Sequence, residues 1–246
     1  MSNQGTTLEI FTGIILQKSK IAEHTIHIKI QSADFSKIKY VAGFTTDVFL
    51  SNPYYNPHSV SREYSFWNYE PVYNIADLAI NTFSNGEGTD WVKGIQEGDT
   101  IFFKEPSGDL VIDQSGENYF LIGDITALSH LYEINRALAV SKEVYSLIYA
   151  GSKEDVFPDI DHSFPLKYYI LRPIDSESIL DLINIYFPKD SKNTVAYVLG
   201  DSENATAIYK FLKDNPDFDI QRIYFKSFWK KNGNANNHKK FNDRMS

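Results

Sequence analysis

The first half of the chain carries the pattern of short β-strands. Residues 25–30 alternate polar and apolar side chains, which is the period of a strand that buries one face. Turn-forming stretches, among them the loop 51–60 with its two prolines, separate further short apolar runs. These runs end at residue 50 or lie at residues 64–67, 75–80, 100–103 and 110–112. Six or more short strands with little helix predict a small antiparallel β-barrel.

The pattern changes near residue 115. Residues 119–122 form a continuous apolar run, which is typical of a strand buried on both faces, and residues 123–126 lead into a helix. The apolar positions of that helix repeat at helical spacing, at Leu128, Leu131, Ile134 and Leu138. Strand-like and helical segments then alternate, with strands at 144–149, 168–171, 195–199 and 223–225 and helices at 179–186 and near 207–212. This alternation predicts an α/β unit with a parallel sheet.

Two structural units follow from this change of pattern. We expect an antiparallel β-barrel over residues 1–115 and an α/β parallel-sheet domain over residues 116–232. A basic, flexible tail over residues 233–246 completes the chain.

Composition narrows the classes of protein. None of the 246 residues is cysteine, so disulfides, thiolate metal sites and cysteine nucleophiles are excluded, and we expect a cytoplasmic location. The N-terminal segment lacks the features of a signal peptide, and no apolar run is long enough for a transmembrane helix. The six histidines show no metal-ligand spacing, so we expect no metal site.

The charge is distributed unevenly. The chain has a net charge of −8, but residues 226–246 hold six Lys or Arg and one Asp, a net of +5, which leaves −13 on the rest. An acidic body of this kind argues against nucleic-acid binding, which needs a basic surface.

One four-residue segment combines a cation, an aromatic ring and a hydroxyl: Arg62-Glu63-Tyr64-Ser65. Side chains alternate along a strand, so Arg62 and Tyr64 share one face, while Glu63 and Ser65 share the other. A guanidinium beside a phenol ring suits a ligand with a phosphate and a flat ring system. The alternative is an ordinary solvated strand edge.

Three turns are further candidates. The stretch 85–91 places Gly86 and Gly88 before a short helix expected at 89–94, which Thr89 or Asp90 would cap, and a helix N-terminus binds anions. Residues 121–128 and 197–202 each make a strand, a turn and a helix start, where parallel sheets bind nucleotides. In the first turn, Asp124 or Thr126 has the alternative role of a helix cap, and the same alternative applies to the turn at Gly200-Asp201.

The order of these motifs resembles that of the flavin-containing siderophore-interacting proteins, also called ferric-siderophore reductases, of the ferredoxin-reductase-like superfamily. The resemblance covers roughly residues 8–231. It rests on five segments in order, namely Arg62 to Ser65, Gly86 to Trp91 with Glu97-Gly98-Asp99, Gly123 to Leu128, Gly200-Asp201, and Phe228-Trp229-Lys230-Lys231.

The resemblance implies FAD in the barrel. Arg62 would hold the pyrophosphate, Tyr64 would pack on the isoalloxazine ring, and Ser65 would hydrogen-bond the flavin edge near N5. The backbone amides of Gly88, Thr89 and Asp90 would complete the phosphate site. Three neighbouring residues join the expected cofactor contacts: Phe66, Gly86 and Trp91.

The resemblance also implies an enzyme that passes electrons from NADH or NADPH through the flavin to a ferric siderophore, releasing Fe(II) for iron acquisition. The nucleotide would bind near Gly123, Asp124, Thr126, Ala127, Gly200 and Asp201. The chain departs from the family pattern at Phe66-Trp67, where the family has Val-Arg, and at Ser129, where it has Pro. These departures leave room for reduced ferredoxin as the donor.

The basic tail offers a place for an anionic substrate. We expect Lys226, Lys230 and Lys231, with Trp229, to form a basic, aromatic wall near the flavin, and a solvated tail is the alternative. Two other functions stay open at this point: a related flavin oxidoreductase with a different acceptor, and a flavin-binding module without catalysis.

Overall fold

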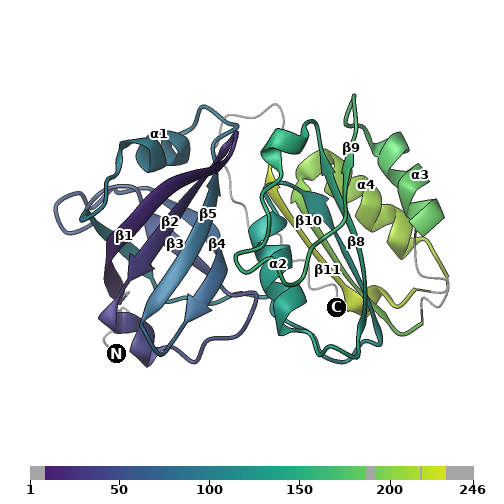
Figure 1. Cartoon of the computed structure of the whole chain (residues 1–246), viewed down its shortest axis with the longest axis horizontal. Coiled ribbons are helices and arrows are strands. Elements are labelled where there is room, and N and C mark those ends of the chain that lie inside the picture. Colours follow the sequence, from purple (N-terminus) through teal and green to yellow (C-terminus); the bar gives the residue numbers. More distant parts are fainter. Residues whose placement is uncertain (1–8, 187–191, 217, 231–246) are drawn as a thin grey trace, which may run out of the picture.

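The first half of the protein forms a closed antiparallel barrel of six strands. A computed structural model describes residues 9–186, 192–216 and 218–230. The barrel order is β1-β2-β5-β4-β3-β6, and the helix α1 covers one end of it (Figure 1). The elements of this half are β1 Ile10–Ala22, β2 Thr25–Gln31, η1 Ala33–Lys37, β3 Thr45–Phe49, β4 Ser61–Glu70, β5 Ile75–Asn81, α1 Glu87–Gly94 and β6 Thr100–Lys104.

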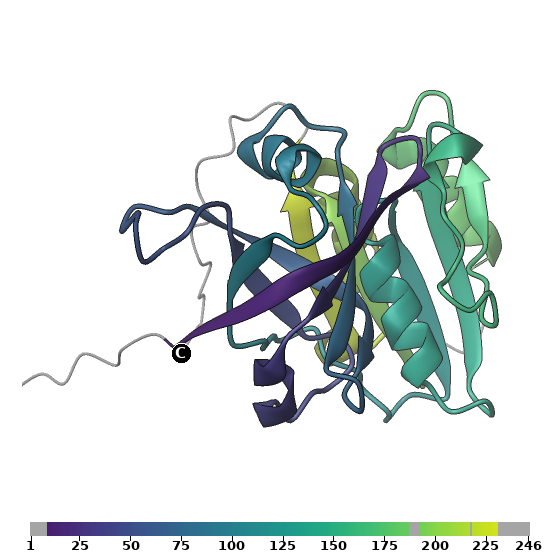
Figure 2. The same ribbon diagram turned by 60° about the vertical axis from the view of Figure 1, so that its left-hand side comes forward.

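The second half is a five-stranded parallel sheet with helices on both faces. Its strand order is β11-β10-β7-β8-β9. Helix α2 lies between the sheet and the barrel, and α3 and α4 cover the far face (Figures 1 and 2). The elements are β7 Asn118–Asp124, α2 Leu128–Ala137, β8 Glu143–Ala150, η2 Lys153–Asp155, β9 Tyr168–Ile170, α3 Ser176–Tyr186, β10 Thr194–Asp201, α4 Ser202–Lys213, η3 Ile220–Arg222 and β11 Ile223–Trp229.

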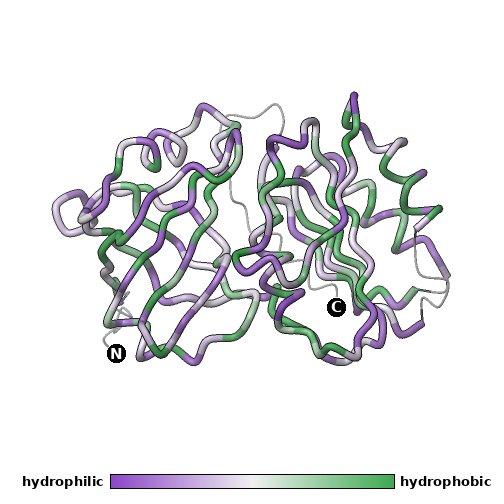
Figure 3. Tube along the Cα trace, viewed as in Figure 1, coloured by the Kyte–Doolittle hydropathy of each residue, from purple (hydrophilic) through white to green (hydrophobic). Residues whose placement is uncertain are grey.

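The central strands β7 and β10 are buried on both faces, as their continuous apolar runs predict. Alternate residues of β7 enter different cores: Leu121 packs with α2, and Phe120 packs under α3 and α4. The hydropathy along the trace follows this arrangement, with apolar segments concentrated in the sheet (Figure 3). The predicted fold class, a barrel followed by an α/β parallel sheet, is therefore confirmed.

Two local predictions are wrong. Residues 110–112 form no strand, although Leu110 is buried; this segment links the barrel to the sheet and packs beneath α2. Helix α1 begins at Glu87 rather than at residue 89, and its N-cap is Gly86, which makes no side-chain cap bond. Neither Thr89 nor Asp90 is therefore a cap.

The barrel is also buried on the side that the alternation of β2 marks as polar. Thr25 and His27 are buried because the second half of the protein covers this side of the barrel. His27 Nε2 lies 2.7 Å from Asp77 Oδ1, and the His27 ring stands edge-on to Trp67. The polar face of β2 thus contributes to the contact between the two halves.

A buried polar cluster fastens strand β4 to helix α2. The guanidinium of Arg136 donates to Asp159 Oδ1 and to the backbone carbonyl of Trp67. The Trp67 indole Nε1 donates to the same Asp159 Oδ1 over 3.2 Å. Trp67 belongs to the barrel, and the other two residues belong to the second half, so this cluster holds the halves in register.

A second contact between the halves holds a buried carboxyl group. Glu133 of α2 accepts a hydrogen bond from the Tyr40 hydroxyl and another, at 3.1 Å, from the Gly43 amide. Burial is the largest influence and raises the pKa of Glu133 from 4.5 to about 7, against the opposing effect of these hydrogen bonds.

We expect this carboxyl group to make stability depend on pH. Between pH 4.5 and about 7 the folded protein holds a proton on Glu133 that the unfolded chain releases. Its stabilising contribution is therefore complete below pH 4.5 and is lost as the pH rises through 7. Between pH 5 and pH 8, the free energy of unfolding of the wild type, measured in urea, should fall by on the order of 2 kcal/mol more than that of Glu133→Gln. Parallel pH profiles for the two proteins would contradict the prediction.

Candidate functional site

Strand β4 and helix α1 bring the predicted cation and ring together. An ideal Cβ on Gly88 would lie 2.7 Å from the Tyr64 hydroxyl oxygen and 3.6 Å from Arg62 Cγ. Arg62 and Tyr64 therefore share the face of β4 that meets α1, as the alternation predicts. Only glycine at position 88 allows the helix to approach this closely.

The guanidinium of Arg62 lies at the first turn of α1. Its Nη2 donates to Glu87 Oε2 over 2.7 Å, and its Nη1 donates to the Ser61 carbonyl over 3.0 Å. The amides of Thr89 and Asp90 both donate to the Gly86 carbonyl, at 2.8 and 3.0 Å. These two amides are thus engaged within the helix, whereas the amides of residues 87 and 88 lie in its first turn and have no intrahelical acceptor.

The Tyr64 ring has an aromatic neighbour from α1. The rings of Tyr64 and Trp91 have centroids 6.2 Å apart and planes 21° apart. Burial raises the pKa of the Tyr64 phenol to about 12, despite the opposing charge of Arg62, so the phenol is neutral at physiological pH. Phe66, two residues further along the strand, has no exposed surface and packs in the barrel core. The side chain of Phe66 thus belongs to the core, and a contact between this residue and the cofactor stays a prediction.

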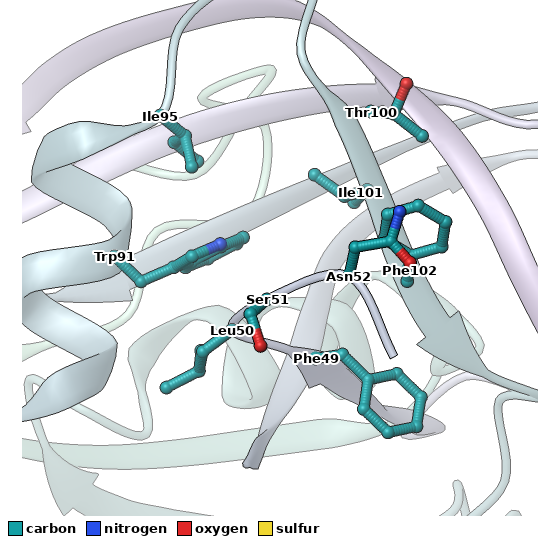
Figure 4. Close-up of a pocket in the computed structure, with 9 residues that line it drawn as sticks. All are labelled: Phe49, Leu50, Ser51, Asn52, Trp91, Ile95, Thr100, Ile101 and Phe102. Carbon is teal, nitrogen blue, oxygen red and sulfur yellow. The ribbon is translucent and has the colours of Figure 1, made fainter. Parts of the chain in front are cut away.

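Trp91 also lines a cavity of about 420 Å³ on the barrel (Figure 4). Leu50, directly after β3, and Asn52, in the loop 51–60, both line it, and Ile95 lines it from the residue that follows α1. The remaining lining residues come from the end of β3, from Ser51 and from β6: Phe49, Ser51, Thr100, Ile101 and Phe102. Six of its nine lining residues are apolar, and the other three are Ser51, Asn52 and Thr100.

The opposite face of β4 meets the second half of the protein. Glu63 accepts from the Thr45 hydroxyl at 2.6 Å and forms an ion pair with Lys226 of β11. Ser65 Oγ lies 3.0 Å from Nδ1 of His130, a fully buried residue of α2. His130 is not recognisable as a functional candidate from the sequence, because only the apolar positions of α2 form a pattern and its partner Ser65 lies 65 residues away.

The ends of β7 and β10 are tied to each other by carboxylates. Asp124 Oδ2 accepts from the Asp201 amide at 2.9 Å and from the Trp229 indole Nε1 at 2.8 Å. Asp124 Oδ1 accepts from the Thr126 amide at 2.8 Å. The two carboxyl groups differ in role: Asp201 caps α4 by accepting from the Asn204 amide, whereas Asp124 caps no helix.

The side chains expected to contact a nicotinamide nucleotide are mostly buried at these strand ends. Five of the six residues expected there are buried: Gly123, Asp124, Ala127, Gly200 and Asp201. A Cβ on Gly123 would lie 2.6 Å from the Leu199 carbonyl, so this glycine serves strand packing. Burial raises the pKa of Asp124, and the hydrogen bonds from Thr126 and Trp229 partly offset this rise. Of the six residues, Thr126 alone is not buried.

The expected basic wall is only partly present. Lys226 is engaged with Glu63, so its charge is compensated, and the Trp229 indole is bound to Asp124. Lys230 is exposed, and Lys231 lies outside the described residues. Over the part of the chain that the structure describes, no three acidic, histidine or cysteine side chains form a group suited to a metal ion. The helices of that part include none with the length and apolarity needed to cross a membrane.

The residues around Arg62 fit the phosphates and ring of a flavin nucleotide. The carboxylate of Glu87, an anion, already occupies the guanidinium of Arg62 at a helix start, which is the position that a phosphate oxygen would take. The side chain of Glu87 is 63% exposed, so an incoming anion is able to displace it.

The six-stranded barrel and the five-stranded parallel sheet together define the ferredoxin-reductase-like fold. Structural comparison finds the same arrangement in a siderophore utilization protein from T. fusca, with a TM-score of 0.78, 13% identity, and 94% of this chain and 96% of that chain covered. Phthalate dioxygenase reductase matches with a TM-score of 0.74, 17% identity, and 92% of this chain and 70% of that chain covered. The expected resemblance to siderophore-interacting and ferredoxin-reductase-like proteins is confirmed.

A similarity in sequence points to the same group. The ferric vibriobactin reductase ViuB of Vibrio cholerae is 23% identical over 182 residues, which are 71% of this chain and 66% of that protein. The match thus spans slightly less than two thirds of that relative. No model of a known protein family matches the chain.

Proposed function

We propose that the protein is an FAD-dependent ferric-siderophore reductase that acts in iron acquisition. The observation that carries the proposal is the cluster of Arg62, Tyr64 and Gly88, in which a cation and a ring meet a glycine at a helix start. The similarity to ferric vibriobactin reductase and to structures of siderophore-interacting proteins supports the acceptor. Bound FAD supplies the step between a two-electron donor and one-electron reduction of Fe(III).

The chain divides the work between its two halves. Residues 1–115 form the FAD domain and residues 116–232 the donor-side domain. Arg62 and the first amides of α1 bind the phosphates, Tyr64 positions the ring as a neutral phenol, and Trp91 supports Tyr64. The donor is NAD(P)H, bound near the ends of β7 and β10, or a reduced ferredoxin. The cytoplasmic location stays a prediction.

The direct test is a spectrum of the purified protein reconstituted with FAD. We expect a flavin absorbance that bleaches with NADH, NADPH or reduced ferredoxin and returns when a ferric chelate is added. Bleaching without return to ferric chelates would favour a different acceptor. Failure to bind FAD would overturn the proposal.

Removing the carboxylate that occupies Arg62 should strengthen flavin binding. Glu87→Gln releases the guanidinium and removes a negative charge that repels phosphate. Because Glu87 is exposed, the effect is small, and we expect a 3- to 5-fold lower Kd for FAD, corresponding to less than about 1 kcal/mol. Asp90→Asn is the matched control. It removes one negative charge from the same first turn of α1, but Asp90 forms no ion pair with Arg62. Equal gains in the two variants would mean that only net charge matters.

A further inference from the structure

His130 and Ser65 form a hydrogen-bonded pair whose direction can be read from their partners. His130 Nε2 lies 3.1 Å from the Leu110 carbonyl oxygen, which accepts only, so Nε2 carries a hydrogen. His130 Nδ1 lies 3.0 Å from Ser65 Oγ. In a neutral imidazole with its hydrogen on Nε2, Nδ1 is an acceptor, so the Ser65 hydroxyl must donate to it.

The surroundings of His130 favour this neutral form. The ring has no exposed surface, and burial lowers its pKa to about 4. Two charged side chains face it, Lys226 of β11 and Glu63 of β4, and they form an ion pair with each other, so their effects on the ring largely cancel. The Phe228 ring, 6.5 Å away between centroids, supplies an apolar neighbour.

We propose that His130 is a positioning residue that turns the hydroxyl hydrogen of Ser65 away from the ligand, so that Ser65 offers only a hydrogen-bond acceptor to the reacting edge of the flavin. The inference rests on the proposed function and on Ser65 lying beside that edge. Ser65 as a residue is half-buried, whereas its partner His130 is fully buried. A reduced flavin carries an N–H at N5 that the oxidised form lacks, so an acceptor at this position stabilises the reduced form selectively.

The selective stabilisation is measurable as a difference in affinity. In the wild type, reduced FAD should bind more tightly than oxidised FAD by a ratio that falls about tenfold in His130→Leu. For a two-electron couple this tenfold change lowers the midpoint potential by about 30 mV. His130→Gln restores both bonds, because its amide donates to Leu110 and accepts from Ser65, and it should keep the wild-type potential. Ser65→Ala should reduce this affinity ratio as much as His130→Leu does. The double variant should reduce the ratio no further than either single variant.

A second measurement needs no flavin. The nitrogen chemical shifts of His130 in the protein without cofactor should show a protonated Nε2 and a bare Nδ1 between pH 6 and 8. A protonated Nδ1 would overturn the proposal, as would equal potentials in the wild type and His130→Leu or an effect of His130→Leu that persists in Ser65→Ala. A wild type that binds no flavin but shows the expected tautomer would overturn the proposed function alone.

Discussion

Replacing Asp159 by Ala is expected to destabilise the protein by about 3 kcal/mol, because it removes the acceptor at the centre of the contact between barrel and sheet. The Asp159 side chain is fully buried, and that of its partner Arg136 is 15% exposed. Without the carboxylate, the Arg136 guanidinium and the Trp67 indole hydrogen are left without this partner in a buried site. For a chain of this length the loss corresponds to a melting temperature roughly 6–12 °C lower.

Two further variants separate charge from hydrogen bonding at this contact. Asp159→Asn keeps an acceptor oxygen but loses the ion pair, so it should fall between the wild type and Asp159→Ala. Asp161→Ala is the control, because it removes an exposed carboxylate two residues away and should change stability by less than about 0.5 kcal/mol. Equal melting temperatures for Asp159→Ala and Asp161→Ala would show that the contact contributes no stability.

The same substitution tests whether the two halves must be docked for electron transfer. Lys226 of the sheet and Glu63 of the barrel meet at a second point of this contact, close to Ser65. If barrel residues bind the flavin, as we propose, Asp159→Ala should weaken donor-dependent reduction of the flavin more than it weakens flavin binding.

The architecture was predictable because the spacing of apolar residues along a strand or helix depends directly on which of its faces are buried. The run at residues 119–122 lies in a strand covered on both faces, and the alternation at Arg62 and Tyr64 sets both toward α1. The turn at Asp201 was compatible with either a nucleotide site or a helix cap. The structure shows that Asp201 caps α4.

What could not be predicted depends on contacts distant in sequence. Phe66 follows the same alternation as Tyr64, but its side chain is fully buried in the barrel core. His27 lies on the polar face of its strand and is nevertheless buried, because another domain covers that face. His130 falls between the apolar positions of its helix, and only the fold brings Ser65 to it.

Replacing Arg62 by Ala should weaken FAD binding about 100-fold. Charge-assisted hydrogen bonds to phosphate contribute about 1.5–3 kcal/mol each, and a tenfold change in Kd corresponds to about 1.4 kcal/mol. Arg62→Lys keeps the charge but loses the planar donor pair, so we expect a loss nearer tenfold. The measurement is a fluorescence titration of the protein without cofactor.

The choice of ligand makes this prediction specific to the phosphate. FMN has a phosphate and should lose affinity with Arg62→Ala, whereas riboflavin has none and should bind wild type and variant equally. Arg172→Ala is the control, because that guanidinium is exposed and donates to the Gly151 carbonyl in the other half of the protein. If riboflavin lost as much affinity as FAD, Arg62 would act through the shape of the ring site. A loss of affinity confined to FAD and FMN would assign Arg62 to the phosphates. This role agrees with the ion pair that the Arg62 guanidinium forms with the carboxylate of Glu87.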